Sequence, residues 1–157
     1  MHVMVAAMGP GYEIGRNGGL PWRRLPGELA WFRQATLGRT VLMGRRTWEG
    51  LPGGLPGRRL IVLTTRRLAG VETCLSITDA LLEHPGSVIA GGGEIYRQAM
   101  PHVSSMLLTR VDGSWMTAGP CDTFFPVPSA TEWTYAPTGR SGEGWMVEEW
   151  RRVSPPP

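Results

Sequence analysis

The sequence contains no lysine, and all 16 of its basic residues are arginine. Cysteine and histidine are also scarce, with two and three residues. Two cysteines cannot form a disulfide framework, and the histidines lack the spacing of a metal site. No apolar run approaches the roughly 20 residues of a membrane span, and the apolar N-terminus breaks at Gly9 too early for a signal peptide. We therefore expect a cytoplasmic protein without a metal site or a membrane segment.

The charge balance is mildly basic and favours no nucleic acid by itself. Thirteen acids against 16 arginines give a net charge of +3, which permits an anionic ligand. With 41% hydrophobic and 18% charged residues, the composition excludes a disordered chain. The 22 glycines and 14 prolines indicate many loops. At 157 residues we expect one domain over residues 1–153, followed by a proline-rich tail at 154–157.

Short apolar runs alternate with helix-like segments, which predicts an α/β sheet with mostly parallel strands. The helices are expected near residues 26–37, where Pro26 suits the first turn, over Ile77–Glu83, and briefly after Gly44 and Gly93. Residues 132–135 and 145–151 predict an antiparallel hairpin whose second strand is polar enough for a sheet edge. The buried strands are expected at Val3–Met8, Thr40–Met43, Leu60–Thr64, Val88–Ala90 and Met106–Val111.

Two basic, hydroxyl-bearing clusters directly follow predicted strands. They are Gly44-Arg45-Arg46-Thr47 and Thr64-Thr65-Arg66-Arg67. Ligands of open α/β sheets bind beyond the carboxyl ends of strands, and arginine pairs bidentately with phosphate. Together the clusters fit a ribose 2′-phosphate, which would favour NADPH over NADH. Either cluster alone reads equally well as a solvated turn.

A third cluster, Gly91-Gly92-Gly93, follows the strand that ends near Ala90 and precedes a helix. Glycines allow the backbone to approach a pyrophosphate closely. The pattern is not the G-x-G-x-x-G fingerprint, so a plain Rossmann dehydrogenase is disfavoured. A tight structural turn is the alternative.

One acid and one arginine suggest a substrate with a polar edge and a negative end. Glu28 shares a helix face with Phe32, beside Leu29, and an acid on an apolar face normally needs a partner. It could receive an amidine-like edge, or it is simply an exposed acid of a first helical turn. Arg58 lies in a turn that leads into a strand, where it could bind a carboxylate or be solvated. No pattern of nucleophilic catalysis is present.

These pieces, in this order, resemble dihydrofolate reductases from Val3 to about Trp150. The resemblance rests on these motifs: Ile14-Gly15, Leu20-Pro21-Trp22, Leu29–Phe32, Met43–Glu49, Leu55–Arg58, Gly91–Tyr96, Thr109 and Asp122–Pro126. It implies a single-domain, eight-stranded, mixed and mostly parallel sheet flanked by four helices, with a C-terminal antiparallel hairpin. It also implies a monomer that reduces 7,8-dihydrofolate to tetrahydrofolate with NADPH and binds antifolates, in support of one-carbon and thymidylate metabolism.

The resemblance also implies a role for each matched residue. The catalytic group comprises Glu28, Trp22 and Thr109. The substrate group comprises Val5, Ala6, Leu29, Phe32, Leu51, Arg58, Ala90 and Tyr96, with Arg58 facing the glutamate carboxylate. The cofactor group comprises Ala7, Ile14, Gly15, Leu20, Gly44, Arg45, Arg46, Thr47, Leu63, Thr64, Thr65, Arg66, Gly91, Gly92, Gly93, Glu94, Ile95 and Tyr96. The Gly91–Gly92 bond is expected to be cis, and residues 15–24 match a mobile loop over the nicotinamide.

The chain also departs from the family pattern. Glu28 stands where many bacterial members have Asp, Ala90 where larger aliphatic residues are usual, and Glu94 where a basic or polar residue is common. One extra residue lies within 23–25, and the segment 113–121 is longer than usual. Glu28 and Ala90 together suggest reduced sensitivity to trimethoprim. Two alternatives stay open: a riboflavin-pathway pyrimidine reductase of the same fold, and an arginine-rich nucleic-acid-binding module.

Overall fold

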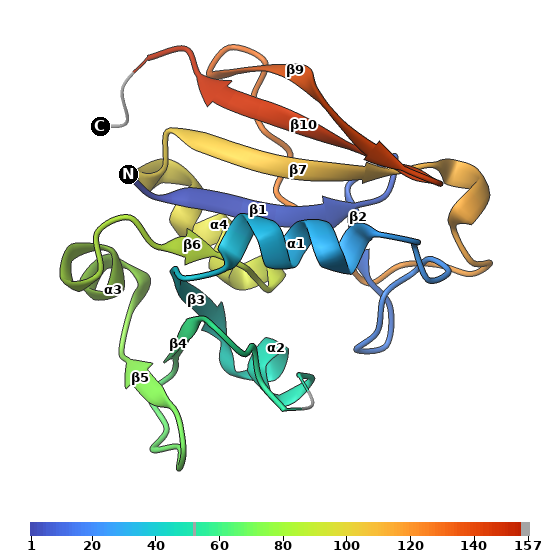
Figure 1. The fold of residues 1–157 in the computed structure, drawn as a ribbon. Helices are drawn as coiled ribbons and strands as arrows, with labels where there is room; N and C mark the ends of the chain where they lie inside the picture. Colours follow the sequence, from blue (N-terminus) through green and yellow to red (C-terminus); the bar gives the residue numbers. More distant parts are fainter. Residues whose placement is uncertain (52, 155–157) are drawn as a thin grey trace.

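The computed structural model describes residues 1–51 and 53–154 (Figure 1). Residues 155–157, most of the predicted proline-rich tail, lie outside the described part. The strands are β1 (Val3–Met8), β2 (Glu13–Gly15), β3 (Thr40–Gly44), β4 (Arg59–Leu63), β5 (Glu72–Cys74), β6 (Val88–Ile89), β7 (Ser105–Val111), β8 (Thr123–Phe124), β9 (Trp133–Gly142) and β10 (Trp145–Arg152). The helices are α1 (Glu28–Thr36), α2 (Arg45–Glu49), α3 (Ile77–Glu83) and α4 (Gly93–Ala99), with 3₁₀ turns η1 (Met100–His102) and η2 (Gly113–Trp115).

The main sheet has eight strands in the order β5-β4-β3-β6-β1-β7-β10-β9, and β2 pairs with β8 in a small separate sheet. Neighbours from β5 to β7 are parallel, whereas β10 is antiparallel to both β7 and β9. The predicted fold class is therefore confirmed. The short strands β2, β5 and β8 were not predicted, because three or fewer residues carry too little periodicity.

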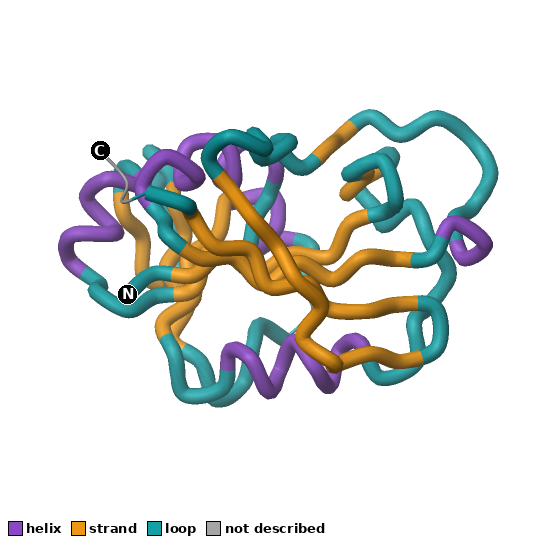
Figure 2. Tube along the Cα trace, turned by 90° about the horizontal axis from the view of Figure 1, so that it is seen from above, coloured by secondary structure: helices purple, strands orange, loops and turns teal. Residues whose placement is uncertain are grey.

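Alternation along β1 sorts the core into two faces. Met4, Ala6 and Met8 belong to a cluster that includes residues of α3 and α4. Val3 and Val5 belong to a second cluster, against which side chains of α1 and α2 pack. Successive side chains of a strand point to opposite faces, so each face acquires its own helices. Figure 2 shows helices on both sides of the sheet.

The prediction that residues 145–150 form an edge strand is wrong. β10 lies between β7 and β9, and β9 forms the edge of the sheet. The polar character of β10 has a different cause, because Glu148 is 7% exposed and pairs with Arg110 of β7. Buried ion pairing, rather than contact with solvent, accounts for a charged residue in this strand.

The predicted helix over residues 26–37 is two residues too long at its start and one at its end. Gly27 adopts the left-handed conformation (φ 81°) as the N-cap, so Pro26 precedes the helix. Gly38 also has a positive φ of 74°, which suits glycine just beyond a helix end. The strand predicted at 60–64 lies one residue earlier, at 59–63. Within the described ranges, no helix is long and apolar enough to cross a membrane.

Candidate active site

The carboxyl ends of four parallel strands lie next to one another, in the order β4-β3-β6-β1. This arrangement brings together the segments that the sequence singled out. Thr64 directly follows β4, Gly44 ends β3, and Gly91 follows β6. The Gly44 amide donates to the Gly91 carbonyl at 2.8 Å, so the two turns are in direct contact. The edge is the location expected for a ligand of an open α/β sheet.

The three consecutive glycines lie where an added Cβ would make tighter than ordinary contacts with its surroundings. A Cβ at Gly91 (φ 109°) would come within 3.2 Å of the Tyr96 hydroxyl, and one at Gly92 within 3.2 Å of Thr47 Oγ1. A Cβ at Gly93 would lie 3.0 Å from Thr123. The Gly91–Gly92 bond is cis, as the resemblance implies. A backbone without side chains at this edge can approach a pyrophosphate closely.

The arginines predicted to bind the cofactor phosphate differ in whether they form ion pairs. Arg45 forms an ion pair with Glu49 at 2.8 Å, one turn further along α2. Arg46 and Arg66 are exposed, and within the described residues neither forms an ion pair. Thr64 Oγ1 accepts from the Arg66 amide at 3.1 Å, which shapes the turn after β4. The guanidinium groups of Arg46 and Arg66 are therefore available to a phosphate, as is that of the exposed Arg67 beside Arg66. Thr65 is exposed in the same turn.

Glu28 is the half-buried acid of the site, at the first position of α1. Burial raises the pKa of its carboxyl group. Phe32, one turn further, packs against the cluster that contains Val5, as the predicted shared face requires. Leu29 is 68% exposed, so it contributes nothing to the core, and its predicted contact with substrate remains untested.

Tyr96 links the glycine turn to β1 and to Glu28. Its hydroxyl donates to the Val5 carbonyl at 2.8 Å, and its ring lies 4.9 Å from that of Phe125. Burial raises the pKa of Tyr96, and the charge of Glu28 raises it further. The direction of this shift agrees with a position of the acid of α1 and the phenol of α4 near one site, although they lie 68 positions apart in the sequence.

The floor of this site is formed by β1 and β7. Thr109 is 1% exposed and lies opposite Ala7 in the register. Trp22 is 8% exposed and packs in a cluster against which Ala7 also lies. Ala6, predicted to contact substrate, directs its side chain to the opposite face of the sheet from Val5. Ala6 can therefore contact substrate only through its backbone atoms.

Arg58 is held near the end of α1. Its Nη1 donates to Thr36 Oγ1 at 3.1 Å, and its Nε donates to the Pro56 carbonyl at 3.1 Å. Desolvation lowers the pKa of Arg58, and the charge of Arg33 lowers it further. Within the described residues no carboxylate pairs with either arginine. With Leu51, Arg58 lines a cavity of about 790 Å³. Such a place suits a ligand carboxylate.

The remaining predicted residues lie around the same edge. Ala90 is half-buried against the cluster of Val5, and its amide donates to the Leu42 carbonyl at 2.9 Å. Glu94 is ion-paired with Arg97 and accepts from Gln98 at 2.8 Å, so its charge is compensated within α4. The other residues predicted to bind the cofactor are Ile14, whose side chain is near Gly93, the half-buried Ile95, the buried Leu63, Gly15 of β2 and the 67% exposed Leu20.

Hydrogen bonds join the segments 15–24 and 113–123, and these contacts are called the clasp below. No role was assigned to them from the sequence. Residues Arg16–Gly19 form a tight turn with mutual backbone hydrogen bonds of 2.9 Å. Asn17 and Gly18, both with positive φ, occupy its centre. Asp122 accepts from the Asn17 amide at 2.8 Å and donates its own amide to Gly15 at 3.1 Å. The dipeptide Asn-Gly is a strong hairpin signal, so the turn itself was detectable from sequence.

Arg16 carries the largest share of this clasp. Its guanidinium donates to Thr117 Oγ1 at 2.6 Å, to the Gly119 carbonyl at 2.6 Å and to the Pro120 carbonyl at 2.9 Å. Cys121 Sγ lies 3.7 Å from the same group. No sequence pattern pointed to Arg16, because its partners are backbone carbonyls about 100 residues away.

Comparison with known proteins identifies the family. A family model described as dihydrofolate reductase matches residues 1–143. The chain belongs to the dihydrofolate reductase family. Among curated relatives, the dihydrofolate reductase of Neisseria meningitidis serogroup A is 41% identical over 140 residues, covering 85% of this chain and 83% of the relative. That of Mycobacterium tuberculosis strain H37Rv is 40% identical over 139 residues, covering 80% and 84%.

A solved structure agrees with these relatives. The dihydrofolate reductase from Enterococcus faecalis, in complex with NADP(H) and RAB-propyl, superposes with a TM-score of 0.79 at 28% identity. The match covers 98% of this chain and 97% of that one. Family membership confirms the predicted enzyme class and NADPH as its cofactor. It also removes both alternatives that the sequence had left open.

Proposed function

We propose that the chain reduces 7,8-dihydrofolate to 5,6,7,8-tetrahydrofolate with NADPH, and that Glu28 is the acid that binds the pterin. The substrate gains a hydride at C6 and a proton at N5. The observation that carries the proposal is the half-buried carboxyl group of Glu28 at the start of α1, one turn before Phe32, which packs against the cluster of Val5. The carbonyl of Val5 accepts the hydrogen bond of Tyr96. Among the residues that the structure describes, Glu28 forms no ion pair. Such an acid suits a neutral, amidine-like ligand edge.

The residues present fit the cofactor. The three glycines form a cradle that a Cβ would fill, and Arg46 and Arg66 are free to face a phosphate dianion. Thr47 Oγ1 and the Gly92 backbone approach each other at the same turn. When bound, NADPH supplies the hydride. The side chains of this chain therefore serve to bind, to orient and to exclude water.

Each remaining residue has a role in holding the substrate. Val5, Phe32 and Leu51 provide apolar walls, and Arg58 binds the glutamate carboxylate of the folate. Glu28 orients the pterin and polarises it, and water admitted beside the 15–24 loop delivers the proton to N5. Holding two reactants face to face supplies a large part of the rate, because it removes the entropic cost of their encounter.

The direct test follows nicotinamide absorbance with NADPH and dihydrofolate. We expect decay with the wild-type chain and almost none with Glu28→Gln at neutral pH. Binding of NADPH, measured by fluorescence quenching, should be equal in the two proteins. Wild-type turnover by Glu28→Gln would remove Glu28 from the mechanism while leaving the family assignment intact.

We also propose that Glu28 and Ala90 weaken the binding of diaminopyrimidine inhibitors such as trimethoprim. Ala90 lies half-buried beside the Val5 cluster, where a larger aliphatic side chain would add apolar wall. Each buried methylene contributes about 0.8 kcal/mol, so a smaller wall favours weaker inhibitor binding. The extra methylene of glutamate, relative to aspartate, places the carboxylate differently against the inhibitor's amidine edge.

A further inference from the structure

The start of α1 has no capping side chain. Its N-cap is Gly27, in the left-handed conformation, and no side chain accepts a hydrogen bond from the first-turn amides. Helices usually begin with Ser, Thr, Asp or Asn, because their side-chain oxygens satisfy those amides and fix the first turn. The first residue of α1 is Glu28. The proposed pterin-binding acid therefore stands on a helix start that its own sequence anchors weakly.

A tryptophan from the far end of the chain contacts this helix start. Trp145, the first residue of β10, donates its Nε1–H to the Pro26 carbonyl at 2.8 Å, across 119 positions of sequence. Its indole lies against Gly27, where a Cβ would be 3.6 Å from Cζ2. The ring is 8% exposed, so solvent competes little for this hydrogen bond.

The indole of Trp145 is itself packed closely by its neighbours. Gly142 lies opposite Trp145 in the antiparallel register of β9 and β10. A Cβ at Gly142 would stand 2.5 Å from Cε2 of the indole, which is a collision. On its other side, the ring belongs to the cluster that contains Trp22 and Leu25. The donor therefore has one orientation, and that orientation is directed at the residue two positions before Glu28.

We propose that Trp145 is a positioning residue for the reaction: through the Pro26 carbonyl it fixes the start of α1 and hence the place of the Glu28 carboxyl group. The inference rests on the proposed role of Glu28. Trp145 contacts neither substrate nor cofactor in this scheme. It leaves the first-turn amides uncapped, but it anchors the helix start to the sheet.

Small shifts of a binding acid have large effects on rate. A misplacement of about 1 Å can reduce turnover roughly a hundredfold. Loosening the helix start also admits water to Glu28, which lowers the pKa of the carboxyl group from its raised value towards that of an exposed glutamate. Tyr96 of α4 is the titratable group coupled to Glu28, and its hydrogen bond to Val5 is independent of Trp145.

The test compares Trp145→Phe with Trp150→Phe. The two substitutions remove one indole donor each from the same strand, but Trp150 donates to Glu148 and packs in the other core cluster, to which no described residue of α1 belongs. For Trp145→Phe we expect an approximately tenfold rise in KM for dihydrofolate and an approximately tenfold slower single-turnover hydride transfer. The dissociation constant for NADPH should be unchanged. The pH midpoint of pterin binding should move to lower pH.

Trp150→Phe should lower the melting temperature without changing KM or the pH midpoint. Gly142→Ala provides a second test that retains Trp145 and displaces its ring, and it decides the matter if Trp145→Phe does not fold. We expect Gly142→Ala to shift KM and the pH midpoint in the same directions. A Trp145→Phe or Gly142→Ala protein that changes only in melting temperature would overturn the positioning role.

Glu28→Gln, measured in parallel, separates this inference from the proposed function. If Glu28→Gln loses hydride transfer while Trp145→Phe keeps wild-type kinetics, Trp145 is not a positioning residue. Glu28 then keeps its role as the pterin-binding acid. Full activity in Glu28→Gln rejects the role of the acid, and the anchor with it.

Discussion

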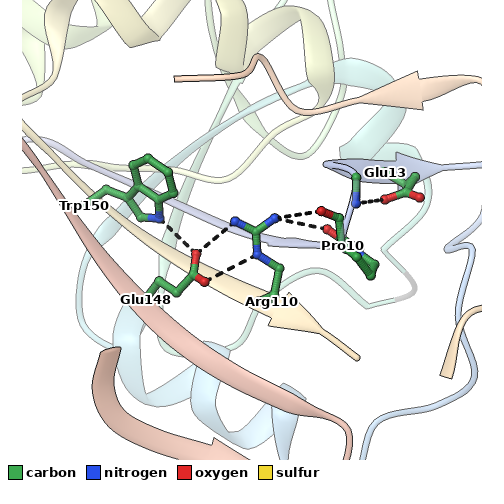
Figure 3. Close-up of polar contacts among 7 residues, drawn as sticks. Pro10, Glu13, Arg110, Glu148 and Trp150 are labelled. Carbon is green, nitrogen blue, oxygen red and sulfur yellow. Dashed lines mark hydrogen bonds and ion pairs between the residues drawn. The ribbon is translucent and has the colours of Figure 1, made fainter. Parts of the chain in front are cut away.

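Arg110 of β7 and Glu148 of β10 form an ion pair of 3.1 Å between Nη2 and Oε1, and both side chains are largely buried. Figure 3 shows that the guanidinium also reaches the turn after β1, where it donates to the Pro10 carbonyl at 3.2 Å. Trp150 donates to the same carboxylate at 3.1 Å. Burial lowers the pKa of Arg110, but the interactions with Glu148 and Tyr12 together more than offset this, so the net pKa is raised. The pair ties the β1–β2 turn to the C-terminal strands.

Glu148→Ala is expected to lower the free energy of unfolding by about 3 kcal/mol, because it leaves a buried guanidinium without its counter-charge. Arg110→Met with Glu148→Met should cost less than the two single substitutions added together. Urea unfolding of the wild type, Glu148→Ala, the two single methionine variants and the double methionine variant measures both quantities. Additive losses would show that the two residues do not stabilise each other.

Glu28→Gln is expected to stabilise the fold at neutral pH while it abolishes hydride transfer. Burial raises the pKa of Glu28 in the folded protein, so the ionised carboxylate opposes folding above that pKa. The stabilisation should vanish as the pH falls below the unfolded value of about 4.3. Urea unfolding between pH 4 and pH 8 tests whether Glu28→Gln raises the free energy of unfolding, with Glu83→Gln of α3 as the control. Equal stability of Glu28→Gln and wild type at pH 7 would contradict it.

Arg58→Gln is expected to raise KM for dihydrofolate about 10- to 100-fold, because a hydrogen bond to a charged group contributes roughly 1.5–3 kcal/mol. A dihydropterin that lacks the glutamate should be reduced equally by both proteins. Arg59→Gln is the matched control, since the neighbouring Arg59 is occupied by an exposed ion pair with Glu72 at 2.6 Å. If KM rises for both substrates alike, Arg58 does not bind the glutamate.

Arg16→Gln is expected to release the segments 15–24 and 117–121 from each other. Their backbone amides should exchange with solvent about tenfold faster, which corresponds to roughly 1.4 kcal/mol of local stability. Exchange in β7 and β10 should stay unchanged. Arg24→Gln removes an exposed guanidinium from the same loop and should have no effect. Unaltered exchange in Arg16→Gln would show that the other hydrogen bonds between the two segments suffice to hold the loop.

Ala90→Ile is expected to tighten trimethoprim binding by about tenfold or more, since three added carbons contribute up to about 2 kcal/mol when fully buried. The affinity for NADPH should change little. Inhibition constants of trimethoprim for the wild type, Ala90→Ile and Glu28→Asp separate the contribution of the apolar side chain at position 90 from that of the acid at position 28. Unchanged trimethoprim affinity in Ala90→Ile would count against the role of Ala90.

Much of the site could be predicted because its residues follow buried strands. Strong apolar runs such as Val3–Met8 predicted the strands correctly, and a parallel sheet necessarily gathers their carboxyl ends. Gly44 and Gly91 therefore meet at that edge. The place of β10 was predicted wrongly, because Glu148 reads as a solvent-exposed residue until Arg110 is seen beside it. The start of α1 was also misplaced, since a positive φ at Gly27 cannot be distinguished by sequence from a first helical turn.

The sequence by itself determined the order of elements, the mostly parallel sheet, the glycine turn and the choice of Glu28 and Arg58. These features depend on local periodicity and residue chemistry. Only the tertiary structure revealed that Trp145 reaches Pro26 and that Arg16 binds the carbonyls of Thr117, Gly119 and Pro120. It also revealed that Ala6 faces away from Val5's side of the sheet. Contacts over about 100 residues to backbone groups leave no pattern in the sequence, because every residue offers the same carbonyl and only the fold selects which one is within reach.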